Sequence, residues 1–504
     1  MHISRLNWIG VIAVLGGGFV AGLAMSRGDR AADHTASPPK APTAVADRST
    51  GSSNANPDDP TESGLAAVVH RFPLTQLDVK ETMESAAVAV TDDGTVHVAW
   101  ASRVSPDEWQ VFLASSSDRG ETFAAPRVVA RSAVHRVTSQ SRGKTITREV
   151  RMMPRLVSHG EELILGWVEA VADNSAVEYR IARSTGGGKS FSSPVVASVT
   201  EGARPTYTSL AVAADGRIGA SWLDNRNKVQ LPAAAISSPD GTFDGDQIIY
   251  EPEGGKGVCP CCPTKLILAD DGTAYLAFRN QQNGFRDMWI SRLPAGSSQF
   301  EPPKPVVAPT WKFDGCPHDG PALVVNDDRL SIAWMDARSG QSRVYLAQGD
   351  SDVENFSAHE IDAEAKHSQG HPALSADRKG TLHLAWDEGS GPAAGAAATA
   401  AENHPSETGA EKSHAHGSEH QATAGETSRQ IRYAAFDATG RRLREPAAVA
   451  PLAGGFQTRP TVAVHPSGDI YIGWVELSER GKSIAVARLK GAPASSVALQ
   501  GTGR

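Results

Sequence analysis

The chain has 504 residues, of which 40% are hydrophobic and 21% are charged, and its formal net charge is −8 at pH 7. No basic stripe interrupts this negative balance, which argues against nucleic acid and anionic membrane surfaces as main partners. The 48 glycines and 31 prolines favour short strands joined by many turns over long helices.

The first 25 residues have the pattern of an export signal. An apolar run over residues 8–25 follows Arg5, and its length suits either a cleaved signal peptide or a retained membrane anchor. Residues 26–64 are rich in Pro, Ala and Ser, which predicts a disordered linker. We therefore expect a periplasmic or secreted protein, anchored in the inner membrane if residues 8–25 are retained.

A hairpin pattern recurs along residues 65–490. Each copy has two stretches of alternating apolar residues, joined by a tight turn and ending in an aromatic side chain, and this period of two predicts strands with a buried face. The seven copies span residues 87–100, 154–167, 208–222, 264–278, 321–334, 372–386 and 460–474. A third strand follows each copy and a fourth follows most of them. Four antiparallel strands in a repeat of roughly 55 residues predict an all-β fold, a β-propeller.

Seven blades are expected, with six as the alternative. The seventh repeat ends after its third strand, near Lys490, and an apolar strand at 68–74 precedes the first repeat. We expect this N-terminal strand to complete the last blade and close the ring. Residues 491–504 are expected to form a flexible tail.

The turn from Ser116 to Phe123 matches the Asp-box pattern, and weaker copies lie at 184–191 and 237–243. In these turns the chain resembles the sialidase (neuraminidase) superfamily, whose propellers carry Asp-box, or BNR, repeats. The resemblance implies a sialidase-like propeller over residues 65–490. Family sialidases use an arginine triad, a Tyr/Glu pair and an acidic residue. The characteristic Arg-Ile-Pro motif is absent here, and no catalytic residue is assigned.

All four cysteines fall in segments that lead into the first strands of neighbouring repeats. Cys259, Cys261 and Cys262 precede the fourth repeat, and Cys316 precedes the fifth together with His318. In a propeller these segments meet at one face of the central channel. Thiolate and imidazole together suit a soft metal, copper(I) first and zinc second. The expected metal ligands are Cys259, Cys261, Cys262, Cys316, His318 and His371.

Disulfides are the alternative for these cysteines. An exported chain with an even number of cysteines often pairs them. Cys259 can pair with Cys262, or Cys316 with either Cys261 or Cys262. Thiol redox chemistry is a further alternative.

A long insertion at 389–428 in the sixth repeat is rich in histidine, with His404, His414, His416 and His420 among small and acidic residues. Such a tract suits a low-affinity metal collector or a solvated linker.

Charged residues gather in loops of the same predicted face. Arginine suits carboxylates, sulfates and phosphates, so these loops favour a small anionic ligand or a glycan. Ion pairs between blades are the alternative. The expected substrate-binding residues are Arg204, Arg279, Arg286, Arg338, Arg459, Asp224 and Asp336.

Together these features predict an exported, sialidase-like binding protein with a Cys/His site for copper or zinc at the channel mouth. Two alternatives stay open. One is an exo-sialidase or other glycoside hydrolase acting on acidic glycans, and the other is an interaction scaffold with disulfide-stapled blades.

Overall fold

The structure, a computed structural model, describes residues 45–47, 64–66, 68–74, 86–141, 144–255, 257–326, 328–390 and 428–490. All of them belong to one compact unit. The expected export segment, most of the expected linker, the histidine-rich tract and the expected tail lie outside the described residues. Among the described residues, no helix has the length and apolar character needed to cross a membrane.

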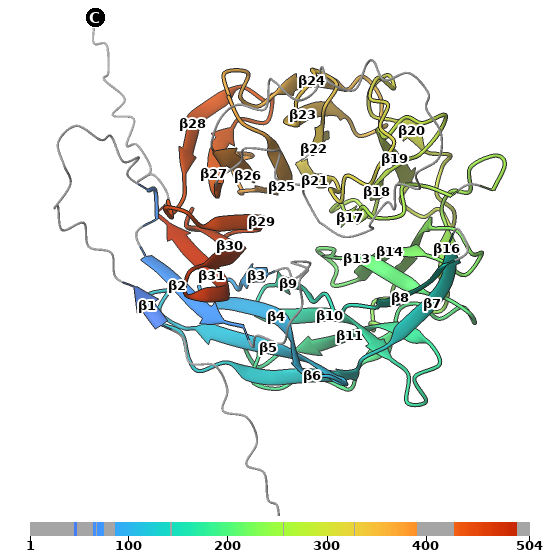
Figure 1. The fold of residues 1–504 in the computed structure, drawn as a ribbon, viewed down its shortest axis with the longest axis horizontal. Coiled ribbons are helices and arrows are strands. Elements are labelled where there is room, and N and C mark those ends of the chain that lie inside the picture. The colour runs from blue at the N-terminus through green and yellow to red at the C-terminus, as the bar shows by residue number, and fades with distance from the viewer. Residues whose placement is uncertain are drawn as a thin grey trace, which may run out of the picture. The chain divides into compact units, whose positions relative to one another are not determined.

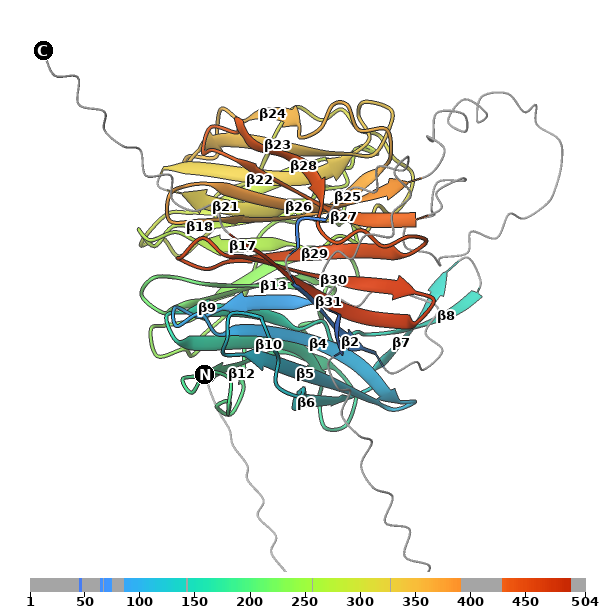
Figure 2. The same ribbon diagram turned by 90° about the vertical axis from the view of Figure 1, so that its left-hand side faces the viewer.

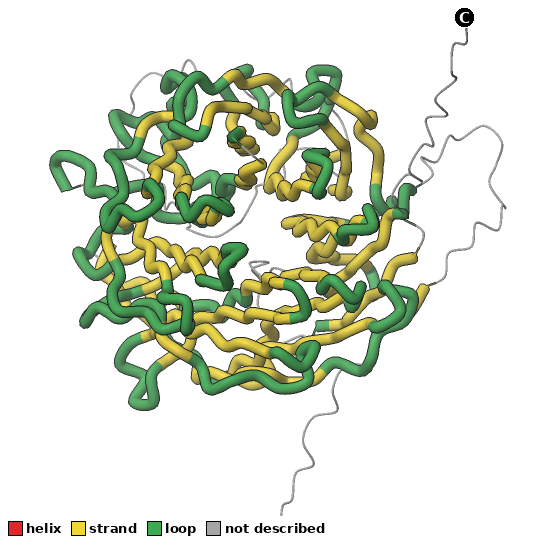
Figure 3. The backbone as a smooth tube through the Cα atoms, turned by 180° about the vertical axis from the view of Figure 1, so that it is seen from behind, coloured by secondary structure: helices red, strands yellow, loops and turns green. Residues whose placement is uncertain are grey.

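The described residues form strands, turns and loops and contain no helix (Figure 3). Five antiparallel sheets of four strands each follow one another along the chain. The first three consist of β3 (Ala87–Val90), β4 (Val96–Ser105), β5 (Glu108–Ser116) and β6 (Arg127–Ala133); β9 (Arg155–His159), β10 (Glu162–Ala170), β11 (Val177–Ser184) and β12 (Val195–Val196); and β13 (Pro205–Val212), β14 (Ile218–Asp224), β15 (Leu231–Ile236) and β16 (Gln247–Ile248). The next two consist of β17 (Lys265–Leu268), β18 (Ala274–Arg279), β19 (Met288–Leu293) and β20 (Lys304–Pro305); and β21 (Ala322–Asn326), β22 (Arg329–Asp336), β23 (Arg343–Asp350) and β24 (Ser357–Glu360).

A nine-stranded sheet contains two further groups of four strands and the short strand β1 (Val45–Asp47). One group is β25 (Gln369–Ala376), β26 (Leu382–Ser390), β27 (Ser428–Phe436) and β28 (Arg442–Ala448). The other is β29 (Phe456–Val464), β30 (Ile470–Ser478), β31 (Gly481–Leu489) and β2 (Val68–Pro73). A single parallel bridge between Arg429 and Phe456 joins the two groups.

The N-terminal strand β2 lies beside the last strand of the chain. It runs antiparallel to β31, from Val68 opposite Arg488 to Pro73 opposite Ser483. The last repeat, which has three strands of its own, therefore receives a fourth strand from residues that precede the first repeat.

The predicted hairpins and third strands are confirmed in all seven repeats. A further hairpin, β7 (Arg136–Ser141) with β8 (Lys144–Glu149), was not predicted from the pattern, and it projects from one side of the unit (Figure 2). Within this unit the sheets surround a common centre, with β3, β9, β13, β17, β21, β25 and β29 innermost (Figure 1). Repeated four-stranded antiparallel sheets around a centre make a β-propeller.

The core lies between consecutive sheets. One apolar cluster combines Trp109 and Leu113 of the first sheet with Leu163 and Trp167 of the second, and later sheets are joined in the same way. Because both faces of the middle strands are covered, these strands are apolar almost throughout. The indoles that end five of the predicted hairpins are fully buried: Trp100, Trp222, Trp334, Trp386 and Trp474.

The predicted Asp-box turn has its expected internal bonds. The Ser116 hydroxyl donates to Asp118 Oδ1 at 2.7 Å and accepts the backbone N–H of Gly120 at 2.7 Å. Asp118 also accepts the backbone N–H of Thr122 at 2.9 Å and its hydroxyl at 2.6 Å. These bonds stay within the turn, so the box stabilises the link between β5 and β6.

Candidate metal centre

The cysteines come from two loops that lead into the innermost strands of neighbouring sheets. Cys259, Cys261 and Cys262 precede β17, and Cys316 and His318 precede β21. The predicted convergence of these two segments is observed. Cys261 lies close to Cys259 and Cys262 of its own loop, and also to Cys316 and His318 of the other loop.

Two glycines allow the backbone to run this way. Gly257 has a φ of +71°, which an L side chain rarely adopts, and a Cβ there would lie 2.8 Å from the carbonyl oxygen of Gln230. A Cβ on Gly320 would lie 2.6 Å from the carbonyl oxygen of Pro263. Gly320 follows the second loop and Pro263 follows Cys262, so the close approach of the two loops requires glycine at this position.

The sulfur atoms of the first loop lie in mutual contact. Cys259 Sγ is 3.8 Å from Cys261 Sγ and 3.5 Å from Cys262 Sγ, and the remaining pair is 3.9 Å apart. No disulfide joins any of the four cysteines, all of which the structure describes. The ligand atoms of Cys261, Cys316 and His318 form a second group within 4.8 Å of one another.

Burial differs between the two groups. Cys259, Cys261 and Cys262 are 0%, 5% and 1% exposed, whereas Cys316 and His318 are partly exposed. Hydrogen bonds donated by Cys261 and Cys262 lower the pKa of the Cys259 thiol, and Arg279 acts in the same direction. Burial raises the pKa of Cys262 well above its usual value. The first thiolate of the cluster is therefore expected on Cys259.

A buried cation lies behind the cysteines. Arg279 is 1% exposed, and its guanidinium donates to the carbonyl oxygens of Asp319, Arg286 and Met335 at 3.0, 2.7 and 2.7 Å. Burial alone would lower the pKa of Arg279, but the neighbouring Cys262 thiol and Asp319 carboxyl raise it. Carbonyl groups satisfy the N–H donors without neutralising the charge, so Arg279 favours thiolate in its neighbours.

Tyr207 covers the cysteines and was missed by the sequence interpretation. Its side chain packs against Cys259, Cys261 and Cys262. Burial raises its pKa, as do the nearby Cys261 and Cys262 thiols. Its φ is +50°, at a register shift of β13 between Thr206 and Ser209. A non-glycine residue in this conformation costs free energy, and such residues gather at functional sites.

The same bulge recurs in two other innermost strands. His371 in β25 and Arg459 in β29 have φ values of +48° and +56°, and both strands shift register there. A β-bulge re-aims the side chain that it carries. The hydrophobic pattern gives no signal for a bulge. The sequence repeat therefore predicted that these residues precede or begin innermost strands, but not their backbone conformation.

His371, the sixth predicted ligand, lies outside both groups of potential ligands among the described residues. Its ring nitrogen Nδ1 is hydrogen-bonded to Asp387 Oδ2 at 2.6 Å, and its backbone N–H donates to Asp319 Oδ2 at 2.5 Å. Asp387 also accepts from Arg429 Nε at 2.7 Å and from the hydroxyl of Thr458 at 2.7 Å. The imidazole is thus held by a buried carboxylate, an arrangement that also supports metal-binding histidines.

The predicted acidic residues of the substrate site have partners close by in sequence. Asp224 and Asp336 are fully buried, and they accept the indole N–H of Trp222 and Trp334 at 2.7 and 2.8 Å. Asp336 also accepts hydrogen bonds from the backbone N–H and the guanidinium of Arg338. Both aspartates end their strands, β14 and β22, and their burial requires that each charge be matched.

The five predicted arginines do not share one environment. Arg279 and Arg286 lie near Cys259, Arg338 is paired as described, and Arg204 is exposed. Arg459 is half-buried, and its backbone N–H donates to Asp387 at 3.0 Å. The contacts of these five side chains therefore differ, and the anion site stays a prediction.

Two other basic residues were not singled out from the sequence. Burial lowers the pKa of Lys265 to about 8, and the neighbouring Arg155 acts in the same direction. Arg155 donates from Nε to the carbonyl oxygen of Thr208 at 2.7 Å. Both lie on innermost strands, Lys265 on β17 and Arg155 on β9. The pattern of alternating apolar residues gives no signal for a basic side chain there.

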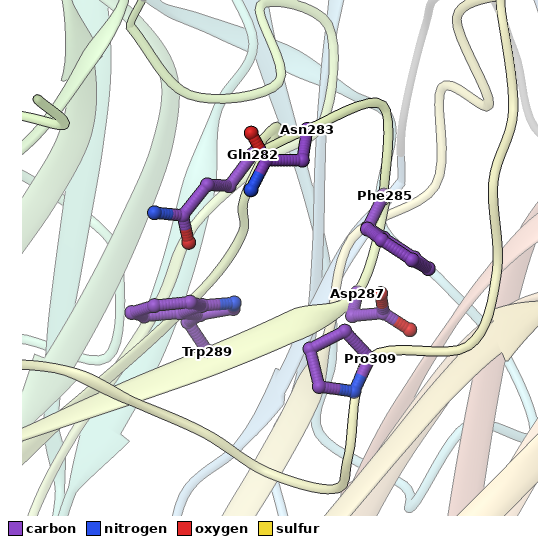
Figure 4. Close-up of a pocket in the computed structure, with 6 residues that line it drawn as sticks. All are labelled: Gln282, Asn283, Phe285, Asp287, Trp289 and Pro309. Carbon is purple, nitrogen blue, oxygen red and sulfur yellow. The ribbon is translucent and has the colours of Figure 1, made fainter. Parts of the chain in front are cut away.

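A cavity of about 160 Å³, with no cysteine in its lining, lies between the β18–β19 loop and the segment before β21. Figure 4 shows Gln282 and Trp289 on one side of the view and Phe285, Asp287 and Pro309 on the other. Ligand pockets commonly measure roughly 300–1,000 Å³, so this cavity is small for a sugar ring.

No protein-family model and no curated protein matches the sequence. Among solved structures the fold is similar to a protein of unknown function from Dyadobacter fermentans, at 12% identity over 64% of this chain and 94% of that one, with a TM-score of 0.39. It is also similar to Trypanosoma rangeli sialidase in complex with the inhibitor DANA, at 12% identity over 71% and 60% of the two chains, with a TM-score of 0.39.

A third similar structure is the β-propeller domain of the Trilobed protease from Pyrococcus furiosus, at 8% identity over 82% of this chain and 100% of that one, with a TM-score of 0.41. These likenesses are too distant to assign a family or an activity to the chain.

Proposed function

We propose that this protein is an exported copper-binding protein built on a seven-bladed β-propeller, with zinc as the second choice of metal. Its ligands are Cys259, Cys261, Cys262, Cys316 and His318. The observation that carries the proposal is the meeting of four thiols and one imidazole, from two separate loops, around Cys261.

The seven-bladed ring is part of the proposal. The pairing of β2 with β31 supports closure, as does the cluster in which Phe72 of β2 and Tyr471 of β30 pack with Trp100 of β4. The hydroxyl of Tyr471 also donates to the carbonyl oxygen of Arg119 at 3.2 Å. These contacts between the last and first sheets support the proposed closure of the ring.

Soft ligands favour a soft metal. Thiolates select copper(I), zinc and iron–sulfur clusters, and a nearby imidazole suits copper and zinc. Arg279 and Arg286 lie close enough to Cys259 to lower its pKa, and metal binding itself requires deprotonated cysteines. The cluster therefore has the ligand type and the charge environment of a thiolate metal site.

The predicted export signal gives the site its context. Outside the cytoplasm, exposed thiols oxidise to disulfides, and a bound metal ion would protect them. Under this proposal the partner is a metal ion that the protein holds in the periplasm, free or tethered through residues 8–25.

Copper(I) titration against a chromogenic chelator, under anaerobic conditions with the full chain, tests this proposal. Cys261→Ser removes the sulfur shared by both groups and should weaken copper(I) binding by at least about 100-fold. This loss is larger than expected for a residue that only supports a metal ligand through a hydrogen bond. Lys312→Ser, an exposed position on the segment between the two loops, is the control and should bind as the natural chain does. Unchanged affinity in Cys261→Ser would contradict the proposal.

A further inference from the structure

We infer that the site takes two copper(I) ions, bridged by the thiolate of Cys261. This inference rests on the proposed function and specifies its stoichiometry and its ligands. An inner ion would be bound by Cys259, Cys261 and Cys262, and an outer ion by Cys261, Cys316 and His318.

The division follows from the positions of the ligand atoms. Cys259, Cys261 and Cys262 form one set and Cys261, Cys316 and His318 form the other, and within each set all ligand atoms lie within 4.8 Å of one another. Cys261 is the member common to both. Among the described residues no such set contains all four thiols.

This arrangement of ligand atoms favours copper(I) over zinc. A structural zinc ion takes four ligands in a tetrahedron, whereas each of the two sets supplies three ligand atoms. Copper(I) accepts fewer ligands, and thiolate sulfur readily bridges two such ions. Two three-membered sets with a shared sulfur therefore fit a pair of copper(I) ions better than one zinc ion.

The charges of the surrounding residues also fit two copper(I) ions. Four thiolates carry four negative charges, and two copper(I) ions neutralise two of them. Arg279 and Arg286, which are 1% and 7% exposed and act on the cysteines electrostatically, supply the remaining two positive charges. With a single copper(I) ion one thiol of the cluster would stay protonated, whereas two ions and two arginines balance four thiolates in the low-dielectric interior.

Burial gives the two ions different accessibility. The inner set is almost completely buried and Tyr207 packs on it, whereas Cys316 and His318 of the outer set are partly exposed. The outer ion should therefore exchange first with a chelator or a receiving protein, while the inner ion stays bound.

The test counts copper(I) ions bound to the full chain by anaerobic titration and native mass spectrometry. The natural chain and Lys312→Ser should each bind two ions, and Cys316→Ser and His318→Ala should each bind one. Chelator challenge of the natural chain should release one ion before the other. Circular dichroism of each variant verifies that it is folded.

One ion in the natural chain, with Cys316→Ser also binding one, would overturn the bridged pair and leave the proposed copper-binding function intact. Two ions retained in Cys316→Ser would also overturn it, because the outer set would not then need that sulfur. No copper bound by the natural chain would instead overturn the proposed function, and the inference with it.

Discussion

At the scale of single residues, the charged side chains near the centre separate into two kinds. Asp224 accepts from the Trp222 indole at 2.7 Å and from Arg226 at 2.7 Å, and it is fully buried. Arg226 is itself paired with Asp246. By contrast, Cys261 and Cys316 come from separate loops, yet their sulfur atoms belong to one group of potential ligands. We infer that the former residues stabilise the sheets and the latter form the site.

Asp224→Asn tests this separation. The change removes one charge of a buried pair and leaves Arg226 with a weaker partner, so the free energy of unfolding should fall by about 3 kcal/mol, while copper(I) binding is unchanged. Urea denaturation and metal titration measure the two effects.

The matched control is Asp215→Asn. Asp215 pairs with Arg217 at the same spacing and at the same 2.7 Å, but it is exposed, so its loss should cost less than about 1 kcal/mol. A loss of metal binding in Asp224→Asn with unchanged stability would show that this carboxylate belongs to the site.

At the scale of elements, the strand β2 contacts both the last sheet and the first. Phe72 is fully buried and stacks on Trp100 with ring centroids 4.9 Å apart. Arg71 of the same strand pairs with Glu476 of β30. The six residues of β2 thus hydrogen-bond to the last sheet, and Phe72 packs against the first.

Phe72→Ala should lower the free energy of unfolding by about 3–5 kcal/mol, because it leaves a cavity between the last and first sheets. Urea denaturation measures the loss. Leu443→Ala, at a side chain that is 50% exposed, should change stability by no more than about 0.5 kcal/mol. Equal effects of the two substitutions would mean that β2 does not join the sheets.

Much of this element-level organisation was predictable from the sequence. Alternating apolar residues and Asp-Gly turns set the strands, and the repeat placed Cys261 and Cys316 in adjacent loops. The conformation of Tyr207 was not predictable, because a bulge leaves no signal in the period of two. The pair between Arg338 and Asp336, two residues apart, was not predicted either, because the residue types suit both an ion pair and a ligand site.

At the scale of the whole molecule, the propeller brings together loops that lie far apart in sequence. The two cysteine segments are separated by the whole of one sheet, β17 to β20, and they meet because successive repeats place their innermost strands side by side. A rigid scaffold with short loops fixes ligands at low entropic cost. Such a scaffold suits the proposed metal site.

The most direct test of the central claim is native mass spectrometry of the protein purified from the periplasm without chelator or reductant. Resolution must suffice to separate bound metal from the loss of two hydrogens for each disulfide. We expect a mass that includes copper, with all four cysteines reduced. A metal-free mass with two disulfides would contradict the account and would make the cysteines structural links between blades.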